Sequence, residues 1–228
     1  MAAWINKLPA TRDCARVEAT ANGDEITLAG FSGNKANLRA AIDKRPGPAS
    51  LTINDSTVQE LPWPQCEVKE NYEVPAIWHR NGLQLQVDGL ADNLHASAGS
   101  ALKIRLNAAK APGYLYVFYI QAQRARNVIP LHQPLFDKGG RPLAAVQEGT
   151  LDLNDPAPGL HRDLVVSAPY GPEVILAIQT RAPLFKRPLA AGDWNERTLL
   201  TRLRSSIAQQ QKSGGILGTD AVYLTTQE

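Results

Sequence analysis

The four histidines are the side chains of this chain best suited to act as a base or to bind a metal. Catalytic and zinc-binding histidines usually belong to recognisable local patterns, such as His-Glu-x-x-His or the partners of a Gly-x-Ser-x-Gly turn. The sequence contains neither pattern and no phosphate-binding glycine loop, and all four histidines fall in segments predicted to be loops. We interpret them as solvated loop residues and predict a protein that is not an enzyme, with no cofactor and no metal. They are His79, His95, His132 and His161.

Acidic side chains around His161 offer a different chemistry. Asp152, Asp155 and Asp163 lie close together in the sequence and could gather around a cation. Their spacing matches no calcium-binding loop, so turn-forming and capping roles are the favoured interpretation. A hydrolase that uses Asp152, Asp155 or His161 is the third hypothesis, behind the two given at the end of this subsection.

The two cysteines, Cys14 and Cys66, bracket one compact segment. A zinc site would need further ligands nearby, and the sequence has no Cys-x-x-Cys pair or histidine cluster to supply them. A disulfide between them is therefore predicted, with two unrelated buried thiols as the alternative. Closing a loop of about 50 residues would stabilise the fold by roughly 4 kcal/mol, and the bond would place the protein in an oxidising compartment.

Basic side chains between residues 181 and 204 form a further group, opposed there only by Asp193 and Glu196. If residues 183–192 fold beside the helix predicted to follow, these charges gather near its exposed face. An anionic protein, lipid headgroups or a cell-wall polymer would bind such a surface. The alternative is an ordinary solvated helix face. The predicted binding residues are Arg187, Arg197, Arg202 and Arg204, with Arg124 and Arg126 from a loop earlier in the chain; Arg181 and Lys186 complete the basic group.

Two apolar runs predict the strands that must hold any such surface in place. From Tyr114 to Ile120, both alternating sets of side chains are mainly apolar, which indicates a strand covered on both faces. Val174–Ile178 is a second run of this kind, after the turn Pro169–Pro172. We expect the two strands to be neighbours in one sheet. We also expect the loops at 121–127 and 132–162 to supply the binding surface, because loops on a rigid scaffold often carry function.

Short elements in the order β-β-α-β are predicted in the first part of the chain. A hairpin turn is expected at Asn22-Gly23-Asp24, and Ser32 or Asn34 can cap the helix. The proline-rich stretch Leu61–Cys66 then leads into an expected linker. The expected strands cover about 16–20, 25–31, 50–54 and 57–61, and the expected helix covers 35–43.

The second part begins near Gly82 with alternating strands and ends in a helix. Asp193 and Glu196 have the spacing of a capping box, and Gly214-Gly215 would end the helix that they begin. Residues 132–162 are predicted to be a long loop. The expected strands are 83–87, 102–106, 114–120, 127–131, 164–167, 174–180 and 221–225, and the leucines and isoleucine of one helix face are Leu199, Leu200, Leu203 and Ile207.

Composition restricts the class of protein more than its function. The chain has 228 residues, 43% of them hydrophobic, and 24 basic against 22 acidic side chains give a net charge of +2. This charge is too small and too dispersed to indicate a nucleic acid partner. There is no run of 18 apolar residues, so no transmembrane segment is predicted. The N-terminus lacks the apolar core of a secretory signal, and we expect Met1 to begin a piece cut from a longer polypeptide, with a cytoplasmic protein as the alternative.

Residues 83–226 resemble a bacterial domain family of unknown function that recurs behind serine/threonine kinase modules and caspase-like modules. The chain departs from the family after the central strand, where Gln121–Arg126 replaces a tight turn. The first part is similar to BON-like domains through its element order and Leu28-Ala-Gly30. The resemblance implies the extracytoplasmic end of a membrane-anchored protein and no particular reaction. The blocks that carry the main resemblance are 113–119, Ile129-Pro130, 168–177, 183–185 and 199–203.

Taken together, these observations predict an α+β chain: a small BON-like β-β-α-β domain over 9–67, a linker over 68–82, and a mainly antiparallel, β-sandwich-like domain with a C-terminal helix over 83–228. The first functional hypothesis is a non-catalytic protein-interaction or sensory module, periplasmic or extracytoplasmic, within a larger envelope, kinase-linked or secretion-linked protein. The second is a direct binder of peptidoglycan or anionic lipid through the basic surface at 181–204.

Overall fold

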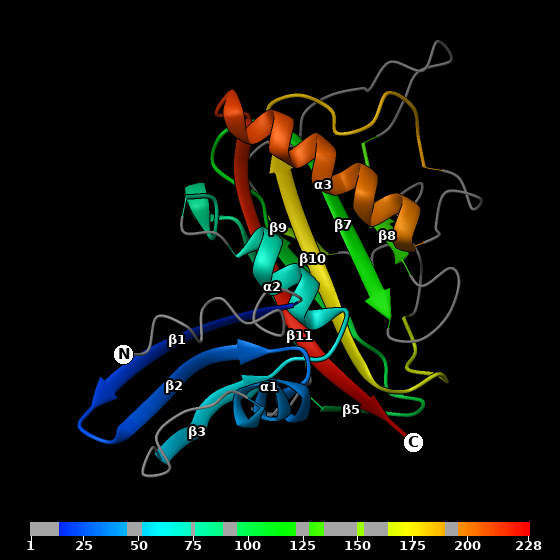
Figure 1. Ribbon diagram of the computed structural model, residues 1–228. Helices are drawn as coiled ribbons and strands as arrows, with labels where there is room; N and C mark the ends of the chain where they lie inside the picture. The colour runs from blue at the N-terminus through cyan, green and yellow to red at the C-terminus, as the bar shows by residue number, and fades with distance from the viewer. Residues whose placement is uncertain are drawn as a thin grey trace. The chain divides into compact units, whose positions relative to one another are not determined.

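The structure of the protein is a computed structural model. Strands predominate in a mixed α+β fold, and the chain divides into two compact units, Met1–Glu70 and Asn71–Glu228 (Figure 1). The residues that the structure describes are 14–44, 52–73, 76–88, 95–121, 128–134, 150–152, 164–189 and 196–228.

A hairpin opens the first unit. Strands β1 (Ala15–Asn22) and β2 (Glu25–Ser32) pair antiparallel, and Asn22 lies opposite Glu25. The loop is therefore Gly23-Asp24, and Gly23 has a φ of +59°, a conformation that glycine adopts without a steric penalty. The predicted hairpin turn is confirmed.

Helix α1 (Lys35–Asp43) follows the hairpin, as predicted. It begins at Asn34, whose side chain accepts a hydrogen bond of 2.8 Å from the backbone N–H of Asn37, so Asn34 is the N-cap residue. Leu38 and Ile42 lie one turn apart and are buried. They pack on the sheet residues Val17, Ile26, Leu28 and Val58.

Strand β3 (Thr52–Glu60) completes the first sheet, in the order β1-β2-β3. It pairs parallel with β2, so α1 is the crossover that a parallel pair requires. We predicted two strand segments here, and the structure has a single strand. Its pairing with β2 shifts register between Thr27, which lies opposite Asn54, and Ala29, which lies opposite Thr57, so the irregularity falls where the two predicted segments were separated.

Helix α2 (Gln65–Tyr72) occupies residues where the sequence predicted irregular chain and a linker. Pro62 and Pro64 motivated that prediction, but both precede the helix, where a proline removes no helical hydrogen bond. Instead their carbonyl groups accept hydrogen bonds from the N–H groups of Cys66 and Val68. The signal that was overlooked is a buried pair at helical spacing, Val68 and Tyr72.

A five-stranded sheet forms the centre of the second unit, in the order β5-β11-β10-β7-β8 (Figure 1). Strands β7 and β10 are antiparallel neighbours, with Ile120 opposite Val174. Val117 and Phe118 point to opposite faces and both are 0% exposed, so the prediction of neighbouring strands covered on both sides is confirmed. The bounds are β5 (His95–Ser97), β7 (Tyr114–Gln121), β8 (Val128–His132), β10 (Pro172–Thr180) and β11 (Ile216–Gln227).

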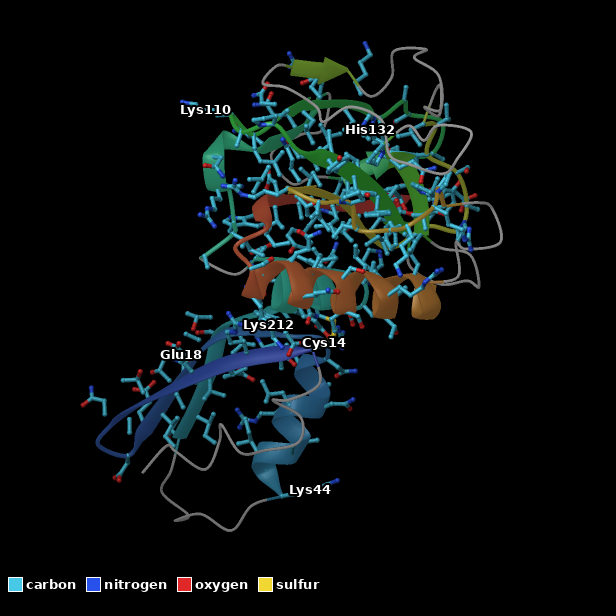
Figure 2. All side chains as sticks on the ribbon, turned by 90° about the horizontal axis from the view of Figure 1, so that it is seen from above. Cys14, Glu18, Lys44, Lys110, His132 and Lys212 are labelled. Carbon is cyan, nitrogen blue, oxygen red and sulfur yellow. A yellow bond between two sulfur atoms is a disulfide. The ribbon has the colours of Figure 1, made fainter. Side chains whose placement is uncertain are left out.

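Different layers cover the two faces of this sheet, and Figure 2 shows them edge-on. One face packs against a second antiparallel sheet, β4 (Gln84–Asp88), β6 (Lys103–Asn107) and β9 (Thr150–Asp152), around a shared apolar core. Helix α3 (Glu196–Lys212) lies on the other face. Its predicted apolar side is buried: Leu199, Leu200, Leu203 and Ile207 are at most 5% exposed. A short 3-10 turn, η3 (Arg80–Gly82), precedes β4.

The strand after α3 differs from its prediction in length and place. We expected a short final strand at 221–225, whereas β11 runs from Ile216 to Gln227 and lies inside the sheet, between β5 and β10. Gly214 has a φ of +66° and ends the helix as predicted. The long loop predicted over 132–162 contains the short strand β9, and most of it lies outside the described residues.

A disulfide joins Cys14 to Cys66 within the first unit, as predicted, and Figure 2 shows it beside the Cys14 label. The two Cα atoms are 5.1 Å apart, within the range that the bond requires. Gly33 lies against the bond: a Cβ added there would stand 3.0 Å from the Cys14 Cβ. Phe31 and Leu61 pack around Cys66. Across the described ranges, no helix has the length and apolar character needed to cross a membrane.

Candidate functional site

A groove with a volume of about 890 Å³ opens in the second unit between residues 182–189 and one side of α3. On the first wall, Leu184, Phe185 and Leu189 turn inward and are 6–8% exposed, so they form an apolar floor. The helix wall is polar. It consists of Thr201, Arg202, Ser205, Ser206, Gln209, Gln210 and the following Ser213.

Tyr116 of β7 fixes the first wall to the sheet. Its hydroxyl oxygen accepts a hydrogen bond of 3.0 Å from the backbone N–H of Leu184. Its ring meets that of Phe185 edge to face, with centroids 5.6 Å apart. Burial raises the pKa of Tyr116 to about 12, so the hydroxyl stays protonated and neutral at physiological pH. The wall is therefore anchored to a central strand at its apolar floor.

Two glutamine side chains fix the ends of the same wall. Gln133, just after β8, bonds both backbone groups of Leu189: its Oε1 accepts from the N–H at 2.9 Å and its Nε2 donates to the carbonyl at 3.2 Å. Gln210 of α3 donates from Nε2 to the Ala182 carbonyl at 2.8 Å and so connects the two walls. The Thr180 hydroxyl donates to the same carbonyl at 2.7 Å. A preformed wall loses little conformational entropy when a ligand binds.

The helix wall presents its polar groups at a regular interval. Thr201, Ser205 and Gln209 recur every fourth residue, and Arg202, Ser206 and Gln210 form a parallel row. Residues four apart lie on the same side of a helix, so both rows run along the groove. The groups are hydroxyls and amides that can donate and accept hydrogen bonds, beside one guanidinium.

Positive charge gathers in this groove. Lys186 and Arg187 come from the first wall and Arg202 from the helix, and no Asp or Glu is found among the described residues that line the groove. Lys186, Arg187 and Arg202 are all exposed. Three basic side chains therefore contribute positive charge to the described lining of the groove.

The structure brings together some of the predicted binding residues and separates others. Arg187 and Arg202 line the groove. Arg204 is exposed on α3 but is not among the lining residues, because a step of two positions carries it about 200° around the helix. Arg124, Arg126 and the side chain of Arg197 lie outside the described residues.

Sequence reasoning missed the uncharged residues of the helix wall. The sequence prediction considered the charged residues and the buried leucines of this helix, whereas the wall consists mainly of Thr, Ser and Gln. Their signal was present in the sequence as a repeat of Thr201, Ser205 and Gln209 at intervals of four residues. A polar stripe of this kind beside a basic surface is a pattern that can be searched for.

A buried carboxylate forms a second polar cluster in this unit. The side chain of Asp220 on β11 is 5% exposed, and its Oδ1 lies 2.8 Å from Nε2 of His79. The backbone N–H groups of Leu85 and Ala221 donate to it at 2.6 and 2.7 Å. Burial raises the pKa of Asp220 above its ordinary value although these hydrogen bonds oppose the shift. The cluster joins the start of β4 and the η3 turn to β11.

The histidines are not all solvated loop residues, so that prediction needs correction. His79 is half-exposed but bonded to Asp220. His132 lies in β8, half-buried, and burial lowers its pKa to about 4. His95 begins β5 and is exposed, and His161 lies outside the described residues. In the described part of the chain, no three His, Cys, Asp or Glu side chains are placed to hold a metal ion.

The third hypothesis, a hydrolase, relies on residues beyond what the structure describes. Asp155, His161 and Asp163, and the side chain of Asp152, all fall outside the described part. Comparison of the chain with models of protein families and with curated proteins finds no match.

Proposed function

We propose that the protein is a non-catalytic interaction module that binds a partner protein, and that it forms the extracytoplasmic part of a larger envelope, kinase-linked or secretion-linked protein. The groove between residues 182–189 and α3 is the observation that carries this proposal. It is concave, mixed in polarity, and held open by contacts from Tyr116, Gln133 and Gln210. A preformed concave surface with a few directed polar groups is typical of a binding site.

The disulfide supports the extracytoplasmic location. Bonds such as Cys14–Cys66 form and persist mainly in oxidising compartments, and are rare where thioredoxin and glutathione keep thiols reduced. The first unit has a small apolar core, chiefly one helix on a three-stranded sheet, and gains much from a covalent link.

The resemblances belong to the same proposal. The β-β-α-β order of the first unit supports its likeness to BON-like domains. In the second unit, the blocks that resemble the kinase-associated family include β7, β10 and residues 183–185 of the groove wall. On this assignment, the groove is a feature of the domain itself.

Crosslinking in the native host tests the proposal. The full chain, carrying a photoreactive residue at position 209 on the exposed groove wall, should capture one specific protein repeatedly. The matched control is the same residue at position 204, which does not line the groove. Capture of nothing beyond bulk envelope material at position 209 would contradict a protein-binding function.

A second candidate function uses the same charges. Lys186, Arg187 and Arg202 could hold anionic cell-wall polymer or lipid headgroups directly. Peptidoglycan or phosphatidylglycerol vesicles should then pull down the protein, less strongly as salt is raised and less strongly with Arg202→Glu. If neither raised salt nor Arg202→Glu reduces the amount of protein pulled down, this candidate function is excluded.

A further inference from the structure

We infer that the first unit binds a second copy of this chain by pairing the two β1 strands edge to edge, antiparallel, about a two-fold axis at Val17. This inference goes beyond the proposed function, because it concerns the first unit and uses no residue of the groove. Three features lead to it: the backbone groups along the outer edge of β1, the contrast with the protected edge at β3, and the placement of two charges.

The backbone groups along the outer edge of β1 point away from the sheet. In the described part of the chain, β1 pairs with β2 alone. Cys14, directly before β1, accepts a hydrogen bond of 2.7 Å from the Gly33 N–H at its carbonyl, and Asn22 lies opposite Glu25 beside the hairpin loop, so the even-numbered residues bond to β2. The odd-numbered residues therefore direct their N–H and C=O groups outward, and they are Ala15, Val17, Ala19 and Ala21.

Strand β3, at the other edge of the same sheet, has features that obstruct pairing. Its Ile53 carbonyl already accepts a hydrogen bond of 3.1 Å from Arg39 of α1. The Asn54 side chain accepts another of 3.1 Å from the N–H of Ser56, and the pairing with β2 shifts register beside these residues. Covered backbone groups and bulges are means of preventing association between edges. In contrast, β1 pairs with β2 without a shift over all 8 of its residues and contains no proline, so its outer edge is regular.

Two charged side chains indicate that the partner strand is a second β1. Arg16 and Glu18 are exposed on the face of the strand opposite the buried Val17. Among the described residues, neither side chain has an ionic partner. With the axis at Val17, Arg16 of each copy lies directly opposite Glu18 of the other, where opposite charges stabilise the pairing. Opposite charges on the two sides of a two-fold axis are self-complementary, as an interface between identical chains requires.

Other registers match the charges less well. An axis at Arg16 or at Glu18 would place two like charges opposite each other, which destabilises a strand pair. An axis at Ala19 would place both charges opposite uncharged side chains. The charges therefore select the register with its axis at Val17.

The same register also satisfies the backbone. Val17 then lies opposite its own copy and Ala15 lies opposite Ala19, so outward-directed residues meet one another. Each such pair exchanges two hydrogen bonds, and the three pairs would supply about six. Helix α1 lies beside β3 (Figure 1), so it does not cover the outer edge of β1.

Sedimentation equilibrium of the full chain tests the inference. Between about 1 and 300 µM, the wild type should pass from monomer to dimer, because an interface of one strand pair is small and therefore weak. Arg16→Glu should raise the dissociation constant of the dimer about tenfold, because it places like charges opposite each other at two sites, and Glu18→Arg should do the same. Lys44→Glu is the matched control. Lys44 lies at the end of α1, away from β1 (Figure 2), and the change should alter the dissociation constant less than about twofold.

Exchange of the two charges separates strand pairing from damage to the fold, and the melting temperature of each variant checks the fold. The double variant Arg16→Glu/Glu18→Arg restores opposite charges in the same register and should dimerise as the wild type does. An equal mixture of the two single variants should form a heterodimer, since one chain carries two acids and the other two arginines at these positions. A wild type that stays monomeric over the whole range, a dimer that neither single variant weakens, or a double variant and a mixture that both fail to associate would each overturn the inference.

Discussion

At the scale of single residues, the buried polar groups of the second unit show what each one contributes. Asp220 receives hydrogen bonds from the backbone of Leu85 and Ala221 as well as from His79. An unpaired buried N–H costs about 1–3 kcal/mol. The carboxylate is therefore retained in the interior because two backbone donors and a side chain depend on it.

Replacement of Asp220 by alanine should destabilise the protein by about 3 kcal/mol, because it leaves the N–H groups of Leu85 and Ala221 without their acceptor. His79→Ala should cost about 1 kcal/mol, since His79 is half-exposed and its partner keeps two other donors. Urea unfolding of both variants measures the difference. Equal losses would mean that the histidine, and not the backbone, is the important partner of Asp220.

His132 should make stability depend on pH. Burial lowers its folded pKa to about 4, below its ordinary value of 6.5, so the folded protein holds the ring neutral while the unfolded chain takes up a proton. The contribution of neutral His132 to the free energy of unfolding is complete above pH 6.5. It is lost as the pH falls toward 4, by up to about 3 kcal/mol.

The pKa of Glu173 and of Asp220 is raised by burial, and these two groups act in the opposite direction, because protonating a buried carboxylate relieves its cost. The measurement is therefore the difference between the wild type and His132→Gln in urea unfolding at pH 4.5 and pH 7. The wild type should lose more stability than the variant on acidification. Parallel losses would show that His132 is not held neutral.

At the scale of elements, the fixed groove wall and the disulfide each replace contacts that a regular element would provide. Residues 182–189 form neither helix nor strand, yet side chains from β7, from the residues after β8 and from α3 hold them. In the first unit, a covalent bond ties the start of β1 to α2. In both cases, a segment is held in place by contacts with residues that are distant in the sequence.

Tyr116→Phe should loosen the groove wall. The change keeps the ring against Phe185 and removes the acceptor of the Leu184 N–H, at a cost of about 1.4 kcal/mol. Hydrogen exchange at the Leu184 amide should become about tenfold faster. Tyr114→Phe, on the same face of β7, is the matched control and should leave that amide unchanged. Unchanged exchange in Tyr116→Phe would show that the wall is held by other contacts.

The disulfide should account for much of the stability of the first unit. Cys14 and Cys66 are 52 residues apart, and closing a loop of this size stabilises by about 4 kcal/mol. A Cys14→Ser/Cys66→Ser variant should show faster amide exchange throughout β1 and β2 and little change in β7 and β10. Thiol titration of the unfolded, unreduced wild type should find no reactive thiol; two would show that the bond is absent in solution.

At the scale of the whole molecule, the sequence predicted what depends on local pattern. The double-sided apolar run at Tyr114–Ile120 identified the central strand, and Leu38 with Ile42 identified the face of α1. The disulfide could be predicted because the chain has two cysteines, Cys14 and Cys66, and they bracket one compact segment. Helix α2 was missed because prolines were given more weight than the buried pair Val68 and Tyr72.

The groove was beyond prediction in detail because its contacts join distant segments. Gln133 and Leu189 are 56 residues apart, and no local pattern connects them. The position of β11 was missed for the same reason: alternation of side chains marks a strand but does not say which strands will flank it. The charges at Arg187 and Arg202 were noticed, whereas their arrangement around a concave surface needed the fold.

The interior position of β11 has a consequence for synthesis. The first sheet is made from consecutive segments, so it can form while the ribosome is still at work on the rest. In the five-stranded sheet of the second unit, β5 and β10 are joined only through β11. The Thr219 carbonyl of β11 also accepts a hydrogen bond from the backbone N–H of His79. The nascent chain must therefore wait for residues 216–227 to leave the exit tunnel before this sheet can close, and until then β10 presents an open edge to chaperones.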